Sequence, residues 1–121
     1  MEALRQIGFY KDHFLDFYDR LDKKARDKIK FVLEILRTQW VVPLNHVKHI
    51  TNSDGIYEII APSIGNDYRT LFFFKEGDLI SGGNEIVLLN GFMKKSKKDY
   101  LPAAKKAELL KIQYFNEHKD N

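Results

Sequence analysis

The chain has 121 residues, which is enough for one domain with a single hydrophobic core. Hydrophobic residues make up 44% of it and charged residues 31%, so a disordered chain is excluded, and no apolar run is long enough to cross a bilayer. The absence of cysteine excludes disulfides and thiolate chemistry, and the charged first residues do not resemble a signal peptide. We therefore expect a single domain over residues 1–121 that works in the cytoplasm and not at a membrane.

Positive charge is concentrated in the last third of the sequence. The net charge of the chain is +3, but residues 94–111 hold seven lysines against Asp99 and Glu108, a net charge of +5 that leaves −2 for the rest. A local basic patch on an otherwise balanced domain is typical of phosphate contacts. It favours nucleic acid over an anionic membrane, because the last expected helix lacks the large Trp- or Phe-bearing apolar face of an interfacial helix.

The first third of the chain predicts a strand and two helices. Residues 2–9 alternate loosely and predict a short strand, and an aromatic stripe at helical spacing then predicts a short helix. The members of this stripe are Phe14, Phe17, Tyr18 and Leu21. A longer apolar stripe predicts a second helix over residues 22–39, with Asp22 as its N-cap. Pro43 ends that helix, and residues 42–55 contain the Asn, Ser, Asp and Gly of a connecting loop.

Three strands and a last helix are expected to follow. The strands are predicted over residues 56–61, 68–75 and 85–92. Their connections favour an antiparallel meander, and the unbroken apolar runs at 71–74 and 86–89 place two of the strands centrally, covered by helices on at least one face. Pro102 fits the first turn of the last helix. The order β-α-α-β-β-β-α predicts an α+β domain in which a helical layer packs on a small antiparallel sheet.

The clearest functional pattern lies at the ends of two expected strands. Arg69 begins an aromatic strand, and Lys94 and Lys95 directly follow another strand. Positive charge at strand ends suits a polyanion such as RNA. The alternative is that Arg69 is a structural strand residue and that the two lysines belong to a solvated loop.

Several short motifs occur in an order that resembles a known family. They are Tyr57-Glu58, Tyr68-Arg69 followed by hydrophobic residues, and Gly91-Phe92 followed by Lys94-Lys95. With the helical hairpin before them and the helix after them, they resemble the RelE/ParE superfamily of bacterial toxins, and within it the HigB-like, phage-derived branch. The resemblance spans nearly the whole chain and implies a RelE-like fold.

The resemblance also implies a function. A HigB-like protein is the toxin of a type II toxin–antitoxin system, a ribosome-dependent endoribonuclease that cuts mRNA in the ribosomal A site. Its partners are the ribosome, the mRNA and a helix-turn-helix antitoxin protein that neutralises it. The ParE branch of the same fold poisons DNA gyrase instead, and fold alone does not separate the two.

RNA cleavage by its own 2′-OH needs a base, positive charge for the developing phosphorane and a proton donor for the leaving 5′-oxygen, and it needs no metal or cofactor. Arg69 offers a planar fork for the non-bridging oxygens. Lys94 and Lys95 can stabilise the same charge or protonate the leaving group. Glu58 is the candidate base, provided that it lies on the open face of its strand with a raised pKa. We expect Arg69→Ala to abolish growth arrest and leave the fold intact.

Further candidate RNA contacts are Lys48, Tyr68, Lys97 and Lys98. A tyrosine in a strand is more simply a half-buried sheet residue, and Glu58 is equally an ion-pair partner for a nearby lysine. His46 and His49 are placed for proton transfer, but their spacing without further ligands does not make a metal site.

One position departs from the family pattern. Many relatives carry an arginine two residues after the glutamate, where this chain has Ile60. Lys48 and Lys97 are candidates to replace the missing cation. Two alternatives to a nuclease therefore stay open. One is a ParE-like binding module that uses the aromatic face of its first helix as an anchor, and the other is a degenerate member that keeps only antitoxin binding.

Overall fold

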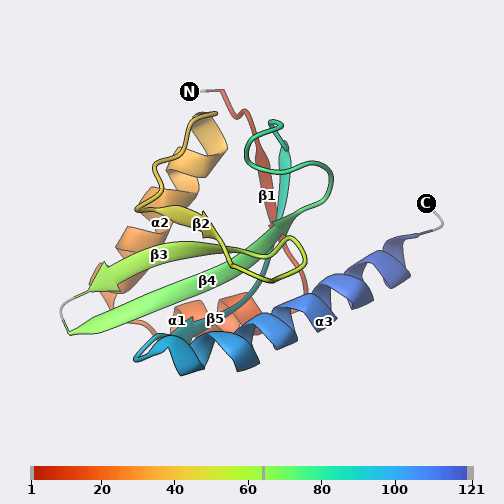
Figure 1. Cartoon of the computed structure of the whole chain (residues 1–121). Helices are drawn as coiled ribbons and strands as arrows, with labels where there is room; N and C mark the ends of the chain where they lie inside the picture. Colours follow the sequence, from red (N-terminus) through yellow and green to blue (C-terminus); the bar gives the residue numbers. More distant parts are fainter. Residues whose placement is uncertain (1, 64, 120–121) are drawn as a thin grey trace.

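Helices cover both faces of a five-stranded sheet in the computed structural model, which describes residues 2–63 and 65–119 (Figure 1). The elements are β1 (Gln6–Phe9), α1 (His13–Asp19), α2 (Lys23–Thr38), β2 (Val47–His49), β3 (Tyr57–Ser63), β4 (Asn66–Phe74), β5 (Glu85–Met93), the short 3-10 helix η1 (Lys97–Asp99) and α3 (Tyr100–His118). The strand order is β1-β5-β4-β3-β2. The predicted α+β class, the helical hairpin and the three long strands are confirmed.

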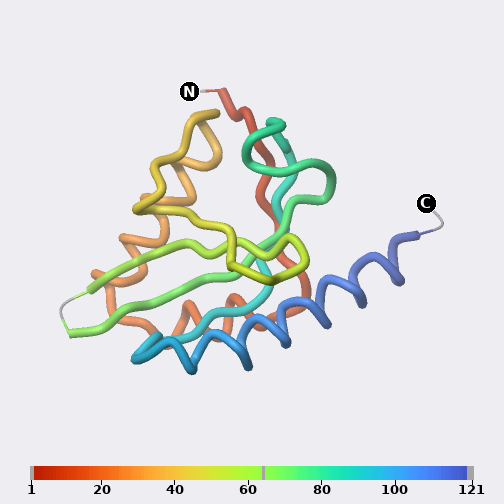
Figure 2. The backbone as a smooth tube through the Cα atoms, in the orientation of Figure 1, coloured from red at the N-terminus to blue at the C-terminus, as the bar shows by residue number. Residues whose placement is uncertain are grey.

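Three features of the fold differ from the prediction. The sheet is mixed, because β1 pairs with β5 in parallel, and Figure 2 shows these two distant segments side by side. The expected loop over residues 42–55 contains β2, an edge strand of three residues that is too short to show an alternating pattern. The helices form two layers and not one. The sequence of a short strand specifies neither its neighbour nor its direction, so the position of β1 could not be predicted.

The unbroken apolar runs of β4 and β5 arise because both faces of the sheet are covered. On β4, Leu71 and Phe73 pack in the core beneath α3, whereas Phe72 and Phe74 pack in a second core with α1 and α2. β5 alternates in the same way. A run of strand residues that is buried on both faces lacks the alternating polar positions of a half-exposed strand, and β4 lies at the centre of the sheet, as this pattern predicted.

Helix α2 begins and ends at identifiable polar contacts. The carboxylate of Asp22 accepts a hydrogen bond from the backbone N–H of Ala25 at 2.8 Å, which confirms the predicted N-cap. At the other end, Arg5 is 1% exposed and donates to backbone carbonyls of that terminus and of the β4–β5 loop. The acceptors are Leu36, Gln39, Trp40 and Gly83, at 2.7 to 3.0 Å. One side chain thus satisfies carbonyls that a helix end leaves unpaired.

Helix α1 packs closely on the end of β5. A side chain at Gly91 would overlap the ring of Phe17, so the glycine provides the room that this aromatic residue needs. The glycine of the Gly91-Phe92 motif therefore has a packing reason. Among residues 2–63 and 65–119, no helix combines the length and the hydropathy of a membrane span.

Candidate active site

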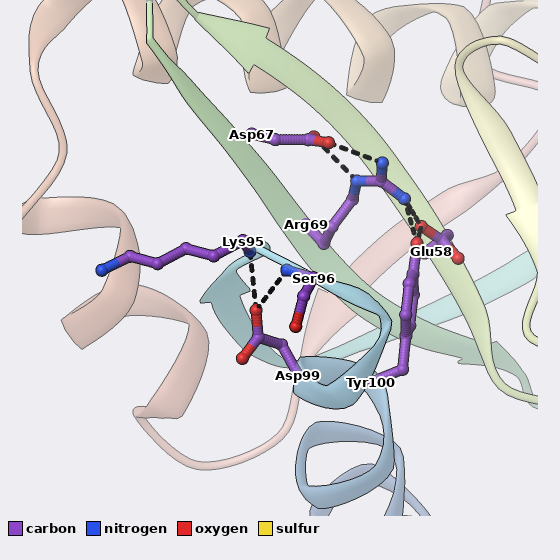
Figure 3. A network of polar contacts seen from close by, with 7 residues as sticks. All are labelled: Glu58, Asp67, Arg69, Lys95, Ser96, Asp99 and Tyr100. Carbon is purple, nitrogen blue, oxygen red and sulfur yellow. Dashed lines mark hydrogen bonds and ion pairs between the residues drawn. The ribbon is translucent and has the colours of Figure 1, made fainter.

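Arg69 lies at the centre of a buried ionic network beneath the first residue of α3 (Figure 3). In the pairing of β3 with β4, Arg69 faces Ile60 and Leu71 faces Glu58, so Glu58 and Arg69 project from the same face of the sheet. Their side chains are 6% and 9% exposed, respectively. Tyr100 reaches the two residues from α3. The site is therefore built from two strands and one helix.

The guanidinium of Arg69 has partners on every side. Its Nε and Nη2 donate to the two carboxylate oxygens of Asp67 at 2.9 and 2.8 Å. Its Nη1 donates to Glu58 Oε1 and to the hydroxyl of Tyr100. The Tyr100 hydroxyl donates in turn to the same Glu58 oxygen at 2.7 Å. Arg69 thus bridges two acidic side chains and a phenol.

These contacts determine how the groups ionise. Burial acts to lower the pKa of Arg69, but its hydrogen bonds with Asp67 and Glu58 outweigh burial and raise the pKa. The hydrogen bond from Arg69 holds the pKa of Asp67 below its ordinary value. Burial, together with the hydrogen bond to Glu58, raises the pKa of Tyr100. At neutral pH Arg69 and Asp67 are therefore charged, and Tyr100 keeps its proton.

This burial corrects one expectation about Arg69. A strand arginine that is exposed can be removed without harm, but here its removal leaves Glu58 inside the protein without its counter-ion. Breaking a buried ion pair costs about 3–5 kcal/mol. Arg69→Ala is therefore expected to destabilise the fold, which makes it a poor test of catalysis.

The structure brings Lys94, but not Lys95, to the network. Lys94 Nζ lies 5.4 Å from the centroid of the Tyr100 ring, and Arg69 Cζ lies 5.7 Å from the same centroid. The Lys94 backbone N–H also donates to the Asp67 carbonyl at 2.7 Å. Figure 3 shows the Lys95 side chain extending away from Arg69, while its backbone N–H donates to Asp99. Of the three predicted cations, Arg69 and Lys94 therefore both lie beside the Tyr100 ring, and Lys95 does not.

An open hollow of about 580 Å³ lies beside the network. Its lining residues are Ser63, Gly65, Asn66, Asp67, Met93, Lys94 and Lys95. Asp67 lines the hollow and also holds Arg69, with a side chain that is 35% exposed. Lys94 and Lys95 therefore line the open hollow directly, whereas Arg69 is separated from it by the Asp67 carboxylate.

The remaining candidate RNA contacts lie in different places. Lys48 is exposed on β2 and pairs opposite Glu58, so its side chain extends from the same face of the sheet as the network. Lys97 and Lys98 are exposed on η1, close in sequence to the hollow. Tyr68 is half-buried on the opposite face, where its ring centroid lies 6.3 Å from that of Phe17. Lys48 is therefore the one of these four residues that lies directly opposite Glu58 in the sheet.

Other residues of the predicted motifs serve the packing. Tyr57 is half-buried, with its ring stacked on Phe72 and 5.3 Å from His49 between centroids. His46 packs edge-on against Phe31. Ile60, which occupies the position of the missing cation, is half-buried directly opposite Arg69. Within the described part of the chain, no three His, Asp or Glu side chains lie close enough together to hold a metal ion.

Two members of the network were not predicted. Asp67 stands two residues before Arg69 in one strand, and the alternation of a strand places both side chains on the same face, so this partner was readable from the sequence. Tyr100 lies 31 residues from Arg69 and 42 from Glu58. Its contact depends on how α3 lies across the sheet, and no local signal in the sequence indicates it.

The fold and the site together define a small α+β domain of the RelE-like type, with an arginine, two acidic residues and a tyrosine at its centre. A family model described as phage-derived protein Gp49-like (DUF891) matches residues 16–111. The chain belongs to this Gp49-like family of phage-derived proteins, which is a RelE-like toxin family. No curated protein and no solved structure matches the chain in the other two comparisons.

Proposed function

We propose that the protein is the toxin of a type II toxin–antitoxin system and acts as a ribosome-dependent, metal-independent endoribonuclease on mRNA. The observation that carries this proposal is the group of Arg69, Glu58 and Tyr100 beside a hollow lined by lysines. These are the residue types that RNA cleavage by the 2′-OH requires. Membership of the Gp49-like family supports the same conclusion.

Each group has a role in the proposed reaction. Glu58 does not lie on an open face as expected, because the Tyr100 hydroxyl covers it in the resting protein. In the proposed reaction this hydroxyl moves aside and Glu58 takes the proton of the 2′-OH as its oxygen attacks phosphorus. Arg69 and Lys94 stabilise the negative charge of the phosphorane. The bond to the 5′-oxygen then breaks, and this oxygen takes a proton from Tyr100. The products are a 2′,3′-cyclic phosphate and a 5′-hydroxyl, with Glu58 protonated and Tyr100 ionised, and transfer of one proton from Glu58 to Tyr100 restores both groups. Tyr100 suits the donor role because its raised pKa keeps the proton in place until the transition state.

The contacts with RNA and protein partners extend this proposal. Lys95 is exposed at the hollow, and the exposed Lys97 and Lys98 follow it in the sequence. These lysines would meet the RNA backbone, and Lys48 would approach from β2. Tyr68 would contact RNA only if the strand also passes over the opposite face of the sheet. The proposed partners are the ribosome with its mRNA and a helix-turn-helix antitoxin, in the cytoplasm.

The anchor expected for a ParE-like gyrase inhibitor is the aromatic face of α1, which would have to be exposed to contact a protein target. Phe14 is 6% exposed, and Phe17 and Tyr18 are half-buried against the second core, so the aromatic face of α1 is part of the interior. The degenerate alternative is favoured by one observation, namely that apolar Ile60 stands where a cation would face Arg69. Both alternatives lack RNA cleavage, so a cleavage assay distinguishes them from the nuclease.

The deciding experiment expresses the protein alone in a bacterium and maps the 5′ ends of transcripts. Codon-phased cuts that disappear with Tyr100→Phe, and persist with the matched variant Tyr114→Phe on the same helix, support the nuclease. Loss of DNA supercoiling without cuts supports the gyrase inhibitor. Growth without either effect supports the degenerate member. The last two results each overturn the proposed function.

A further inference from the structure

We propose that Asp67 occupies the place of the RNA phosphate in the resting protein, so that substrate must displace this carboxylate before it reaches the Arg69 fork. The inference rests on the proposed function and adds a residue that controls access to the same site. It follows from the partners that surround the Arg69 guanidinium and from the position of Asp67 in the lining of the hollow.

Asp67 binds Arg69 in the way that a phosphate would. Two N–H groups of one guanidinium edge meet two oxygens of one anion at 2.9 and 2.8 Å, which is the bidentate arrangement that arginine makes with both carboxylate and phosphate. The remaining nitrogen, Nη1, is held by Glu58 and Tyr100. A phosphate therefore finds no free edge of the guanidinium unless one of these partners leaves.

Asp67 is the partner that can leave. The Glu58 side chain is 6% exposed, and the Tyr100 hydroxyl closes over it, so its departure would open the interior. The Asp67 side chain is 35% exposed and already lines the hollow. Lys94 and Lys95 line the same hollow and attract an approaching phosphate. A phosphate that approaches Arg69 through the hollow thus first meets Lys94 and Lys95 and must then displace the Asp67 carboxylate.

The exchange has a consequence for selectivity. A small anion must compete with Asp67 using only the contacts at the fork, whereas a polynucleotide also gains contacts with the surrounding lysines. The carboxylate would therefore exclude free phosphate and admit RNA. Removing the negative charge of Asp67 should strengthen RNA binding through Arg69 in particular, and not through a general change in charge.

The test measures the binding of a short single-stranded RNA that carries 2′-O-methyl groups and is not cut. The proteins compared are the full-length wild type, Asp67→Asn, Arg69→Lys, and the double variant. We expect Asp67→Asn to tighten binding by roughly ten- to a hundredfold, the range for a hydrogen bond to a charged group. In the Arg69→Lys background the gain should fall to less than about threefold, because a lysine has no fork. Asp19→Asn, the same charge change on an exposed residue at the end of α1, should have little effect.

A second measurement needs no variant. Carbon NMR of the Asp67 carboxyl, followed against pH, should show its pKa rising when RNA saturates the wild-type protein, because RNA takes away the Arg69 partner. Equal tightening by Asp67→Asn and Asp19→Asn, a full gain in the Arg69→Lys background, or an unchanged Asp67 titration would each overturn the inference. These readouts use uncut RNA without ribosomes, so they are independent of the transcript map that decides the proposed function.

Discussion

Asp67 and Arg69 stand two residues apart on β4, and the carboxylate of the first holds the guanidinium of the second through both of its oxygens. The pair lies on the face of the sheet covered by α3, where Arg69 also meets Glu58 and Tyr100. The arginine that marks the family motif is thus the hub of a closed network. Its structural and chemical roles must be separated by experiment.

The first prediction concerns stability. Arg69→Ala should lower the free energy of unfolding by about 3–5 kcal/mol, because it leaves Glu58 buried without its cation. Replacing both partners, with Arg69→Met and Glu58→Leu together, should recover much of that loss, since no buried charge of the pair is then left alone. Urea unfolding of the three proteins checks this. A double variant less stable than Arg69→Ala would show that the network contributes more than its ion pair.

The second prediction concerns the proton donor. Tyr100→Phe removes one hydroxyl and should slow RNA cleavage by roughly 10²- to 10⁴-fold while leaving RNA affinity nearly unchanged. Cleavage by purified protein on programmed ribosomes measures the rate, and anisotropy with uncut RNA measures affinity. The control is Tyr114→Phe, since Tyr114 is buried on the same helix and belongs to the core beneath α3. If the two variants lost the same cleavage rate, the Tyr100 hydroxyl would have a structural role and would not be the proton donor.

The third prediction separates the two lysines. Lys94→Ala removes a cation near Tyr100 and should reduce both cleavage and binding, whereas Lys95→Ala removes a cation that points away and should reduce binding alone. Each lost phosphate contact should lower the slope of log affinity against log salt by about 0.7. Titrations at several salt concentrations, with cleavage rates at saturating RNA, check the difference. A slower rate for Lys95→Ala at saturation would contradict it.

The fourth prediction concerns acid stability. Arg69 lowers the pKa of Asp67 from the ordinary 3.8, so the charged carboxylate stabilises the folded state above that value. This contribution should be complete at neutral pH and should be lost as the pH falls below about 4, through the lowered pKa of the folded state. The stability difference between wild type and Asp67→Asn, measured by urea unfolding from neutral pH downwards, should shrink over that range. If this stability difference did not change with pH, the effect of Asp67→Asn would not arise from the charge of the carboxylate.

The fifth prediction concerns Arg5. Arg5→Ala removes the donor of two buried and two partly buried contacts with carbonyls near the end of α2 and in the β4–β5 loop, and each buried group left unpaired costs about 1–3 kcal/mol. We expect a loss of several kcal/mol in the free energy of unfolding. Arg5→Lys should recover little, because one ammonium group does not reach carbonyls spread around a planar fork. The control Arg20→Ala removes an exposed arginine and should change stability by less than about 0.5 kcal/mol.

Most of the fold was readable from local patterns. The apolar stripe of α2 and its cap at Asp22 are strong helical signals, and the continuous apolar runs of β4 and β5 placed those strands centrally. The position of β1, the short β2 and the second helical layer were not predicted. They depend on which elements meet in space, and a strand of three or four residues carries no pattern for that.

The site was only partly predictable for a related reason. Arg69 and Glu58 were found through motifs, and the register of β3 with β4 brings them together. The sequence did not indicate that Arg69 is buried, because its burial depends on Tyr100, which reaches Arg69 from α3, far away in the sequence. An arginine beside an aromatic run is ambiguous until its partners are known.

Successive residues of β4 pack in separate cores, so a substitution at one of them should affect one side of the sheet and not the other. Phe72 faces the core shared with α1 and α2, whereas Phe73 faces the core under α3. Shortening Phe73 should loosen the helix that carries Tyr100, while shortening Phe72 should disturb the hairpin and spare the chemistry. Two adjacent codons therefore allow stability and catalysis to be perturbed separately.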